Sequence, residues 1–494
     1  MHRPRRWSVV VCLVALAAVW PLSSCGPTAS ARPDGGQQSQ EKWLDDRALT
    51  VTPQTEPVPA LKYRLFPLAS ELKEGNAVPI YLRLVHEQND EARRYWTETP
   101  KAWNELPLDQ VPLDKAKEFL KGVRQRFLQQ FDLGARRRTA EWNYTLDQGS
   151  VIEILLPDVQ AMRNYTPMLA LRARVAVAEG DFAAAAHALE TGFAFSRHLA
   201  EGPFLINGLV GIAVASQFAD RVPEWIERPG SPNLYWSLTA LPRPLIDLRQ
   251  ETEWEQRVLE MQFADLADLD RPRSAAEWDA ALKRVRDEIQ RISQPLEGKQ
   301  EKVPPVPGTG PGDPASQSPD LAAARRELTE RFGRPAAEVA AMPPAQVLLL
   351  YLVATYHDYR DDMFKGFSLP YPQARTVFAE AVKRLQSAPN TEAVRVARLL
   401  LPAVNKVQHP QARLDRKIAA LRVIEALRLH AAAHDGRLPD TMAQVTVVPV
   451  PDDPGTGQPF EYQRDGATAT ITSRVPGEPT EKFGLRYRVA VRAK

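Results

Sequence analysis

The spacing of apolar residues predicts short packed helices over most of the chain. Between residues 116 and 131, apolar positions recur every three or four residues with charged and polar residues between them, as on one face of a helix. Proline bounds or interrupts the later segments, which is typical of consecutive short helices. The apolar positions of the first segment are Ala116, Phe119, Leu120, Val123, Phe127 and Phe131. Further helical segments are expected at 250–292, 321–365, 371–387 and 391–401.

The segment 169–203 predicts two antiparallel helices. One apolar-periodic stretch ends at Glu179, Gly180 and Asp181 supply the turn, and a second stretch closes near Pro203. The segment resembles a helical hairpin of the tetratricopeptide type, in which glycine permits the reversal and small alanines let the helices approach. A solenoid needs about three such units, and the sequence has one clear copy. A generic helical hairpin and a true repeat array therefore both remain open.

The pattern changes in the last part of the chain. A helix is expected from about Gln411 to Ala433, followed by a turn-rich stretch and two strand-like runs at 467–473 and 483–491. Earlier, the alternation in 59–67 predicts one further short strand. The predicted fold class is therefore mainly α, with packed helical hairpins and a small C-terminal α+β module. The alternating residues of 59–67 are Leu61, Tyr63 and Leu65.

Two breaks divide this pattern into expected domains. Residues 25–59 are polar and lack apolar periodicity, so we expect a flexible tether. Residues 303–319 hold six prolines and three glycines, which predicts a linker. The expected divisions are a signal peptide at 1–24, the tether at 25–59, a helical domain at 60–302, the linker at 303–319, a helical segment at 320–404 and the α+β module at 405–494.

The N-terminus has the pattern of an export signal. Basic residues precede an apolar run of 16 residues from Trp7 to Leu22, which is too short to span a bilayer comfortably. The run ends in "LSSC", which resembles the lipobox of bacterial lipoproteins and implies lipidation of Cys25 after cleavage. We therefore expect a lipid-anchored protein of the cell envelope, facing the periplasm or the surface. Gly26 follows the cysteine where an acidic residue would favour inner-membrane retention, so the outer membrane is expected.

Charge and cysteine content exclude several classes of function. The chain has 63 Lys and Arg against 61 Asp and Glu, and loss of Arg3, Arg5 and Arg6 with the signal leaves a formal charge of −1. So balanced a charge argues against nucleic acid as a partner. Cys12 would leave with the signal and Cys25 would be acylated, so thiol chemistry and disulfides are not expected.

The C-terminal module resembles two groups of proteins. Its order of helix, turn-rich loop and strand is similar to uncharacterised exported proteins of planctomycete-type bacteria, and more distantly to the head of type II secretion major pseudopilins. The module follows a large helical body and lacks the long apolar N-terminal helix of a pseudopilin, so filament assembly is not expected. The residues that carry the resemblance are Gly436, Pro439, Asp453, Pro454, Gly457, Gln458, Pro459 and Tyr462.

The pseudopilin resemblance implies a candidate calcium loop. Asp452, Asp453 and Asp465 lie close in sequence, and calcium binds six to eight oxygen ligands. Their spacing is not that of an EF-hand, and Asp-Pro and Asp-Gly pairs also occur in turns without any ion. We expect an ion-free connection, with calcium as the alternative and no other cofactor.

Two further groups of residues are candidate ligands or catalysts. His430 and His434 are four apart on the expected helix, which is a spacing used for zinc, but residue 431 is not a glutamate. The neighbouring Gly436 favours a plain helix end instead, because histidine and glycine are both suited to a helix C-terminus. The second group is expected to be the charged face of a helix, with shared metal or proton binding as the alternative. Its members are His357, Asp358, Asp361 and Asp362.

No diagnostic catalytic motif occurs in the sequence. Walker, G-x-G-x-x-G, G-x-S-x-G and H-E-x-x-H patterns are all missing, so no catalytic residue is assigned. We expect a non-enzymatic envelope protein held to the membrane by its lipid, whose helical body binds a protein partner as an interaction or scaffold module. The alternative is an envelope hydrolase with a dispersed acidic or metal-dependent active site.

Overall fold

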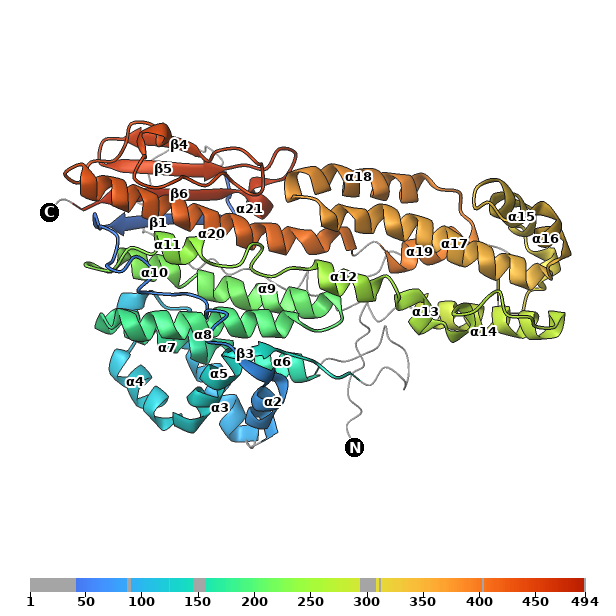
Figure 1. Ribbon diagram of the computed structural model, residues 1–494, viewed down its shortest axis with the longest axis horizontal. Helices are drawn as coiled ribbons and strands as arrows, with labels where there is room; N and C mark the ends of the chain where they lie inside the picture. Colours follow the sequence, from blue (N-terminus) through green and yellow to red (C-terminus); the bar gives the residue numbers. More distant parts are fainter. Residues whose placement is uncertain are drawn as a thin grey trace, which may run out of the picture. The chain divides into compact units, whose positions relative to one another are not determined.

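The computed structural model describes residues 41–86, 90–123, 125–144, 157–293, 308–310, 312–401 and 404–492. These residues are mainly helical and include a small four-stranded sheet, which confirms the predicted fold class (Figure 1). The predicted signal peptide and Cys25 lie outside the described residues. None of the described helices combines the length and the apolar composition needed to cross a membrane.

The chain divides into two compact units. The larger unit contains the described parts of 21–143, 156–251 and 409–494, and the smaller unit contains those of 144–155 and 252–408. Residues on both sides of the predicted linker at 303–319 belong to the smaller unit, so this segment does not lie between the two units.

The helices of each unit are short, apart from a few long ones. The larger unit contains α2 (Val78–His86), α3 (Asp90–Asn104), η1 (Leu108–Gln110), α4 (Leu113–Gly122), α5 (Gln125–Ala135), α6 (Pro157–Arg163), α7 (Thr166–Glu179), α8 (Phe182–Ala200), α9 (Leu205–Ala219), α10 (Val222–Glu227), α11 (Tyr235–Thr239), η6 (Met442–Gln444) and α21 (Thr480–Phe483). The smaller unit contains α13 (Val258–Gln262), η3 (Ala264–Leu266), α14 (Ala275–Ser293), η4 (Ala315–Gln317), α15 (Leu321–Glu330), α16 (Ala336–Ala341), α17 (Pro344–Phe364), η5 (Lys365–Ser368), α18 (Tyr371–Ser387) and α19 (Glu392–Leu400). Two helices, α12 (Arg249–Glu255) and α20 (Val404–Ala433), have residues in both units.

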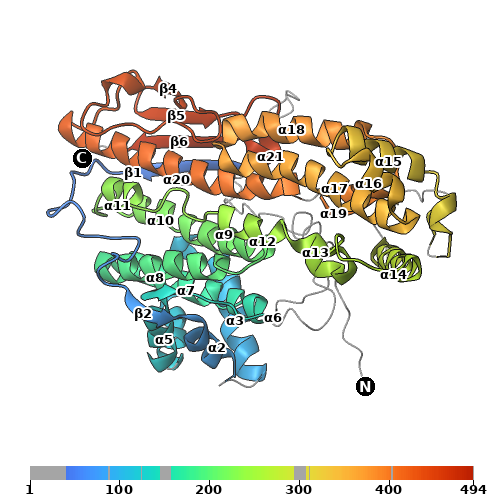
Figure 2. The same ribbon diagram turned by 45° about the vertical axis from the view of Figure 1, so that its right-hand side comes forward.

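The hairpin predicted at 169–203 is present as α7 and α8. Gly180 ends α7 with a positive φ of 76°, a conformation that glycine adopts without a steric penalty. Asp181 then caps α8 by accepting a hydrogen bond from the Ala184 amide at 3.0 Å. Figures 1 and 2 both show α9 running beside α8 as a third helix of this layer. The helical hairpin is confirmed, and its tetratricopeptide likeness stays a prediction.

The four-stranded sheet has the order β1-β6-β5-β4. Strand β5 (Thr468–Ser473) is antiparallel to both of its neighbours, β4 (Glu461–Asp465) and β6 (Leu485–Val491), and β5 and β6 match the two strands predicted there. Strand β1 (Asp45–Val51) pairs with β6 in parallel. A separate two-stranded sheet joins β2 (Lys73–Asn76) and β3 (Arg137–Thr139). The N-terminal part of the described chain thus completes the C-terminal module.

Two sequence predictions near the N-terminus are wrong. Residues 45–51 were expected in the tether, yet they form β1, with Leu49 and Val51 buried. The strand expected around Tyr63 is a loop, because the Tyr63 carbonyl accepts a hydrogen bond from the Ser237 hydroxyl and its ring meets Trp225 edge-on at 5.8 Å. The alternating apolar residues of 59–67 therefore belong to a loop that is anchored to helices, and Leu65 is buried beneath this loop.

A buried ion pair holds the described part of the predicted linker to its own unit. Arg286 of α14 binds both carboxylate oxygens of Glu392 at 2.9 Å, and both side chains are almost fully buried. The same guanidinium donates to the Asp313 carbonyl at 2.9 Å. The Glu392 amide donates in turn to Asp320 at 2.7 Å. Residues 312–320 are therefore fixed by hydrogen bonds on both sides of η4.

Removal of this buried cation should destabilise the smaller unit. We expect Arg286→Met to lower the free energy of unfolding by about 3–5 kcal/mol, because Glu392 would remain buried without its partner. Chemical denaturation of the full chain, followed by circular dichroism, measures this loss. Arg284→Met on the same helix is the control, since its exposed pair with Asp265 should contribute less than about 1 kcal/mol. Equal losses in the two variants would contradict the assignment.

Candidate functional site

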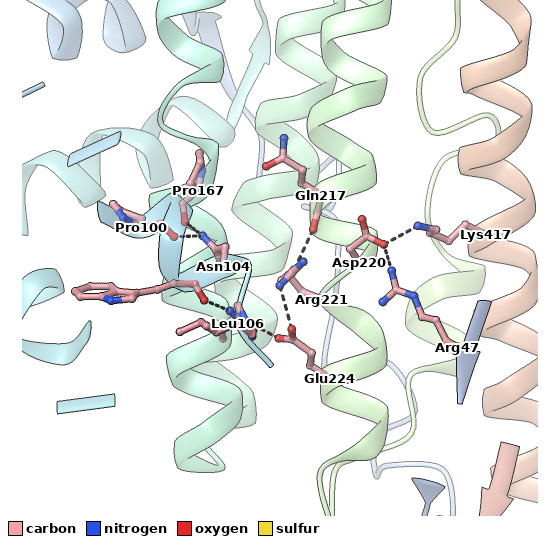
Figure 3. Close-up of polar contacts among 12 residues, drawn as sticks. Arg47, Pro100, Asn104, Leu106, Pro167, Gln217, Asp220, Arg221, Glu224 and Lys417 are labelled. Carbon is pink, nitrogen blue, oxygen red and sulfur yellow. Dashed lines mark hydrogen bonds and ion pairs between the residues drawn. The ribbon is translucent and has the colours of Figure 1, made fainter. Parts of the chain in front are cut away.

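Two acidic and two basic side chains meet where β1, the end of α9 and α20 come together. Asp220 accepts hydrogen bonds from Lys417 Nζ at 2.6 Å and from Arg47 Nη2 at 2.5 Å (Figure 3). Asp45 accepts from Arg47 Nε at 2.8 Å and from the Tyr487 hydroxyl at 2.6 Å, and lies 3.3 Å from Lys417 Nζ. We call these five residues the strand clamp, because they fasten β1 to two helices.

Electrostatics keep the two acids and the two bases of the strand clamp ionised at neutral pH. Burial by itself would raise the pKa of Asp45 and Asp220, but the charges of Lys417 and Arg47 outweigh it and lower both pKa values. Burial would likewise lower the pKa of Lys417, but Asp220 and Asp45 raise it. Each acid therefore lies beside both cations, and the cluster has no net charge.

A second network of ion pairs and hydrogen bonds includes Arg221, the residue after Asp220. Glu224 of α10 accepts hydrogen bonds from Arg221 at 3.0 Å and from Arg174 Nε at 2.8 Å (Figure 3). Arg174 is fully buried and also donates to the carbonyls of Trp103 and Leu106, at 2.7 and 2.6 Å. These carbonyls lie at the C-terminal end of α3, where a cation compensates the unpaired carbonyl groups and the helix dipole. Arg174 therefore ties α3 to α7 and α10.

The three candidate calcium ligands are not brought together. Asp453 is buried and forms an ion pair with Arg416 of α20, at 3.0 Å from Nε, while it also accepts from the Gly455 amide at 2.8 Å and from the Ser473 hydroxyl. Asp452 and Asp465 are exposed. Within the described residues, no group of three or more His, Cys, Asp or Glu side chains could hold a metal ion. Asp453 thus anchors the loop to α20.

The predicted helix end at His434 is confirmed. Helix α20 ends at Ala433, and Asp435 and Gly436 then adopt positive φ angles of 51° and 82°. The Gly436 amide donates to the Ala431 carbonyl at 2.8 Å, as expected of a left-handed helix cap. The rings of His430 and His434 are stacked at 3.9 Å with planes 13° apart. Because imidazole lone pairs lie in the ring plane, two nearly parallel rings do not direct them at one ion.

The acidic residues of 356–364 are paired with cations. Asp358 binds Arg331 and Arg384, and Asp362 binds Arg384 and, at 2.7 Å, Lys365. The other two candidates of this stretch are paired as well: His357 with Glu260 at 2.6 Å, and Asp361 with Arg360 at 2.8 Å. The segment is the charged face of α17, bound to α15 and α18, as the sequence predicts.

Glu251 and Asp415 have no cationic partner among the described residues. Burial raises the pKa of Glu251 to about 8, and that of Asp415 to about 7, although the Leu245 amide donates to Asp415 and so opposes the shift. Glu251 is only 3% exposed, whereas Asp415 is half-buried. These are the described carboxyl groups best suited to exchange a proton near neutral pH.

Sequence reasoning did not find the strand clamp. Its members are spread from residue 45 to residue 487, so no local spacing connects them. Helix α20 is buried on all sides over residues 418–431, and it contains buried charges, including Arg416, Glu425 and Arg428. A buried charge on such a helix requires a partner from another segment.

The chain matches no family model, no curated protein and no solved structure. The fold and the site therefore define the class directly. It is a mainly helical protein with a small α+β module, in which the strand clamp joins segments distant in sequence. The observed role of the clamp is to hold these elements together.

The strand clamp should make stability depend on acid pH. We expect Lys417→Met to lower the free energy of unfolding by about 2–3 kcal/mol at pH 7, because the buried Asp45 and the half-buried Asp220 would then share one cation. Both acids have folded-state pKa values below their ordinary 3.8, so their contribution is complete above that value and is lost as pH falls below it. The difference from wild type should therefore shrink below about pH 4. Denaturation at pH 7 and pH 3 measures it, with the exposed Arg437→Met as control.

Proposed function

We propose that the protein is a lipid-anchored protein of the cell envelope, whose helical part binds another protein as an interaction or scaffold module. The basic, apolar and small-residue regions that end at Cys25 support the anchor. The fold adds to this support, since β1 begins 20 residues after Cys25 and is held to the larger unit along its whole length. An anchor at Cys25 would then be coupled to the folded unit through the strand clamp.

One observation favours an interaction module over an enzyme. The ionisable side chains of the strand clamp and of the Arg174 network pair with each other, so they contribute to assembly and not to proton transfer. The layer of α7, α8 and α9 also supports the proposal, because antiparallel helical layers commonly serve as protein-binding surfaces. The resemblance to exported planctomycete-type proteins and to pseudopilin heads agrees with an envelope location and remains a prediction.

The alternative is an envelope hydrolase with dispersed acidic residues. A specific observation favours it: Asp415 is half-buried and has a pKa of about 7, which suits a general acid or base. Its hydrogen bond from the Leu245 amide and its place on α20 explain the side chain as part of the packing as well. Among the described residues, no second carboxyl group contributes to the pKa of Asp415, so we rank the hydrolase second.

The anchor is tested by removal of the acylated sulfur. We expect Cys25→Ala to move the protein from the membrane fraction to the soluble fraction, because no thioether-linked lipid can form. Fractionation of cells that express the full chain, with a high-salt wash and immunoblotting, measures this. Cys12→Ala is the matched control and should leave the protein with the membranes, since Cys12 lies inside the apolar signal run. Retention of the Cys25→Ala protein on washed membranes would contradict lipid anchoring.

The interaction role is tested on the lipidated protein from its native envelope. We expect a detergent extract to contain the protein in a complex of defined stoichiometry, which survives gel filtration and cross-linking. A protein that elutes alone and releases soluble products from purified envelope polymers would support the hydrolase instead. In that case Asp415→Asn should abolish the release while the exposed Asp452→Asn should not.

A further inference from the structure

The first turns of α9 and α12 pack closely around a buried carboxyl group. A Cβ at Gly208 of α9 would lie 2.3 Å from Leu248 Cδ2, so the contact exists only because residue 208 has no side chain. The carboxyl carbon of Glu251 lies 3.8 Å from the same position. Glu251 is 3% exposed, and its Oε2 has no hydrogen-bond partner among the described residues. The segment 248–251 therefore places against α9 a carboxyl group of which one oxygen, Oε2, has no partner among the described residues.

The charged groups around Glu251 are mostly negative. Glu201, at the end of α8, and Asp247, just before α12, both act against a negative charge on Glu251. Arg249 binds both oxygens of Asp247, and Arg197 lies 3.7 Å from Glu201. The nearby cations are therefore engaged with other acids.

Burial is the largest cause of the raised pKa of Glu251, and the charges of Asp247 and Glu201 add to it. The amide of Glu251 itself donates to the carboxylate and acts in the opposite direction. The result is a pKa of about 8, against an ordinary value of 4.5. The carboxyl group is therefore mainly neutral in the folded chain at pH 7.

We propose that Glu251 is a proton-dependent latch: its protonated carboxyl group keeps residues 248–251 seated on the first turn of α9, and loss of the proton releases them. A neutral carboxyl group tolerates this apolar setting, whereas a carboxylate there would be buried among like charges without a cation. Exposure of the short first turn of α12 to water relieves that cost without unfolding the unit.

The direction of the pH dependence follows from the two protonation states. The seated form has a pKa of about 8 and the released form has the ordinary 4.5, so the seated form binds the proton more tightly. The latch is therefore firmest below pH 4.5 and weakens as pH rises through 8. The equilibrium between released and seated forms should increase by up to roughly tenfold per pH unit within this window.

Hydrogen exchange of the full chain tests the latch. Wild type, Glu251→Gln and Glu253→Gln are compared at pH 5.5 and at pH 8, in peptides that cover 201–212 and 245–255. Comparison of variants at one pH cancels the intrinsic pH dependence of exchange. We expect the ratio of wild-type to Glu251→Gln exchange rates in these peptides to rise at least tenfold between the two pH values. Glu253 is exposed on the same helix, so Glu253→Gln should behave as wild type.

Two outcomes would overturn the proposal. One is a ratio that does not change with pH, and the other is a change that extends over the whole larger unit, which would mean global destabilisation. If Glu251→Gln does not fold, Gly208→Ala provides the second variant, because its added methyl group displaces Leu248. Gly208→Ala should already raise the exchange rates of the same peptides at pH 5.5. The change from pH 5.5 to pH 8 should then raise these rates less than in wild type. An unchanged response in Gly208→Ala would also refute the latch.

Discussion

Burial of Asp45 beside Lys417 and Arg47, which both also pair with the half-buried Asp220, imposes one constraint on the larger unit: Asp45 is buried at low cost only when the segments that carry these cations are in place. β1 is an edge strand, paired only with β6, and a strand in that position gains little from its own hydrogen bonds. Its attachment therefore depends on the strand clamp and on the apolar side chains beneath it. The strand clamp thus links the N-terminal, central and C-terminal parts of this unit.

Helix α20 is the element through which this constraint acts. Successive residues on it reach different segments: Arg416 binds Asp453 of the C-terminal loop, and Lys417 binds the strand clamp. Two turns further on, Glu425 and Arg428 pair at 2.9 Å, and the Arg428 guanidinium donates to the carbonyl of Ser231 before α11. An apolar helix could slide or rotate against its neighbours with little change in buried area. Fixed ionic partners define its register, which is the role best attested for buried charges.

Local patterns explain which elements the sequence predicts correctly. Each correctly predicted element depends on residues that are close together in the sequence, such as Gly180 and Gly436 at helix ends. These elements are the α7–α8 hairpin, β5, β6 and the end of α20. β1 escaped prediction because its run of seven residues begins with three charged ones and has its partner about 440 positions later. The strand clamp escaped for the same reason. The pseudopilin resemblance made Asp453 a candidate calcium ligand, as the alternative to an ion-free connection, and in the fold Asp453 forms an ion pair with Arg416.

The larger unit therefore has two electrostatic solutions to the cost of burying an acid. The acids of the strand clamp stay ionised because cations lie within hydrogen-bond distance, and their pKa values are lowered. Glu251 has no such cation among the described residues and keeps its proton instead, with a raised pKa. The first solution is complete above about pH 4 and is lost below it, whereas the second loses strength as pH rises from 4.5 to about 8. Because the two respond to pH in opposite directions, a rise in pH loosens the contact between the first turns of α9 and α12 while the attachment of β1 stays intact.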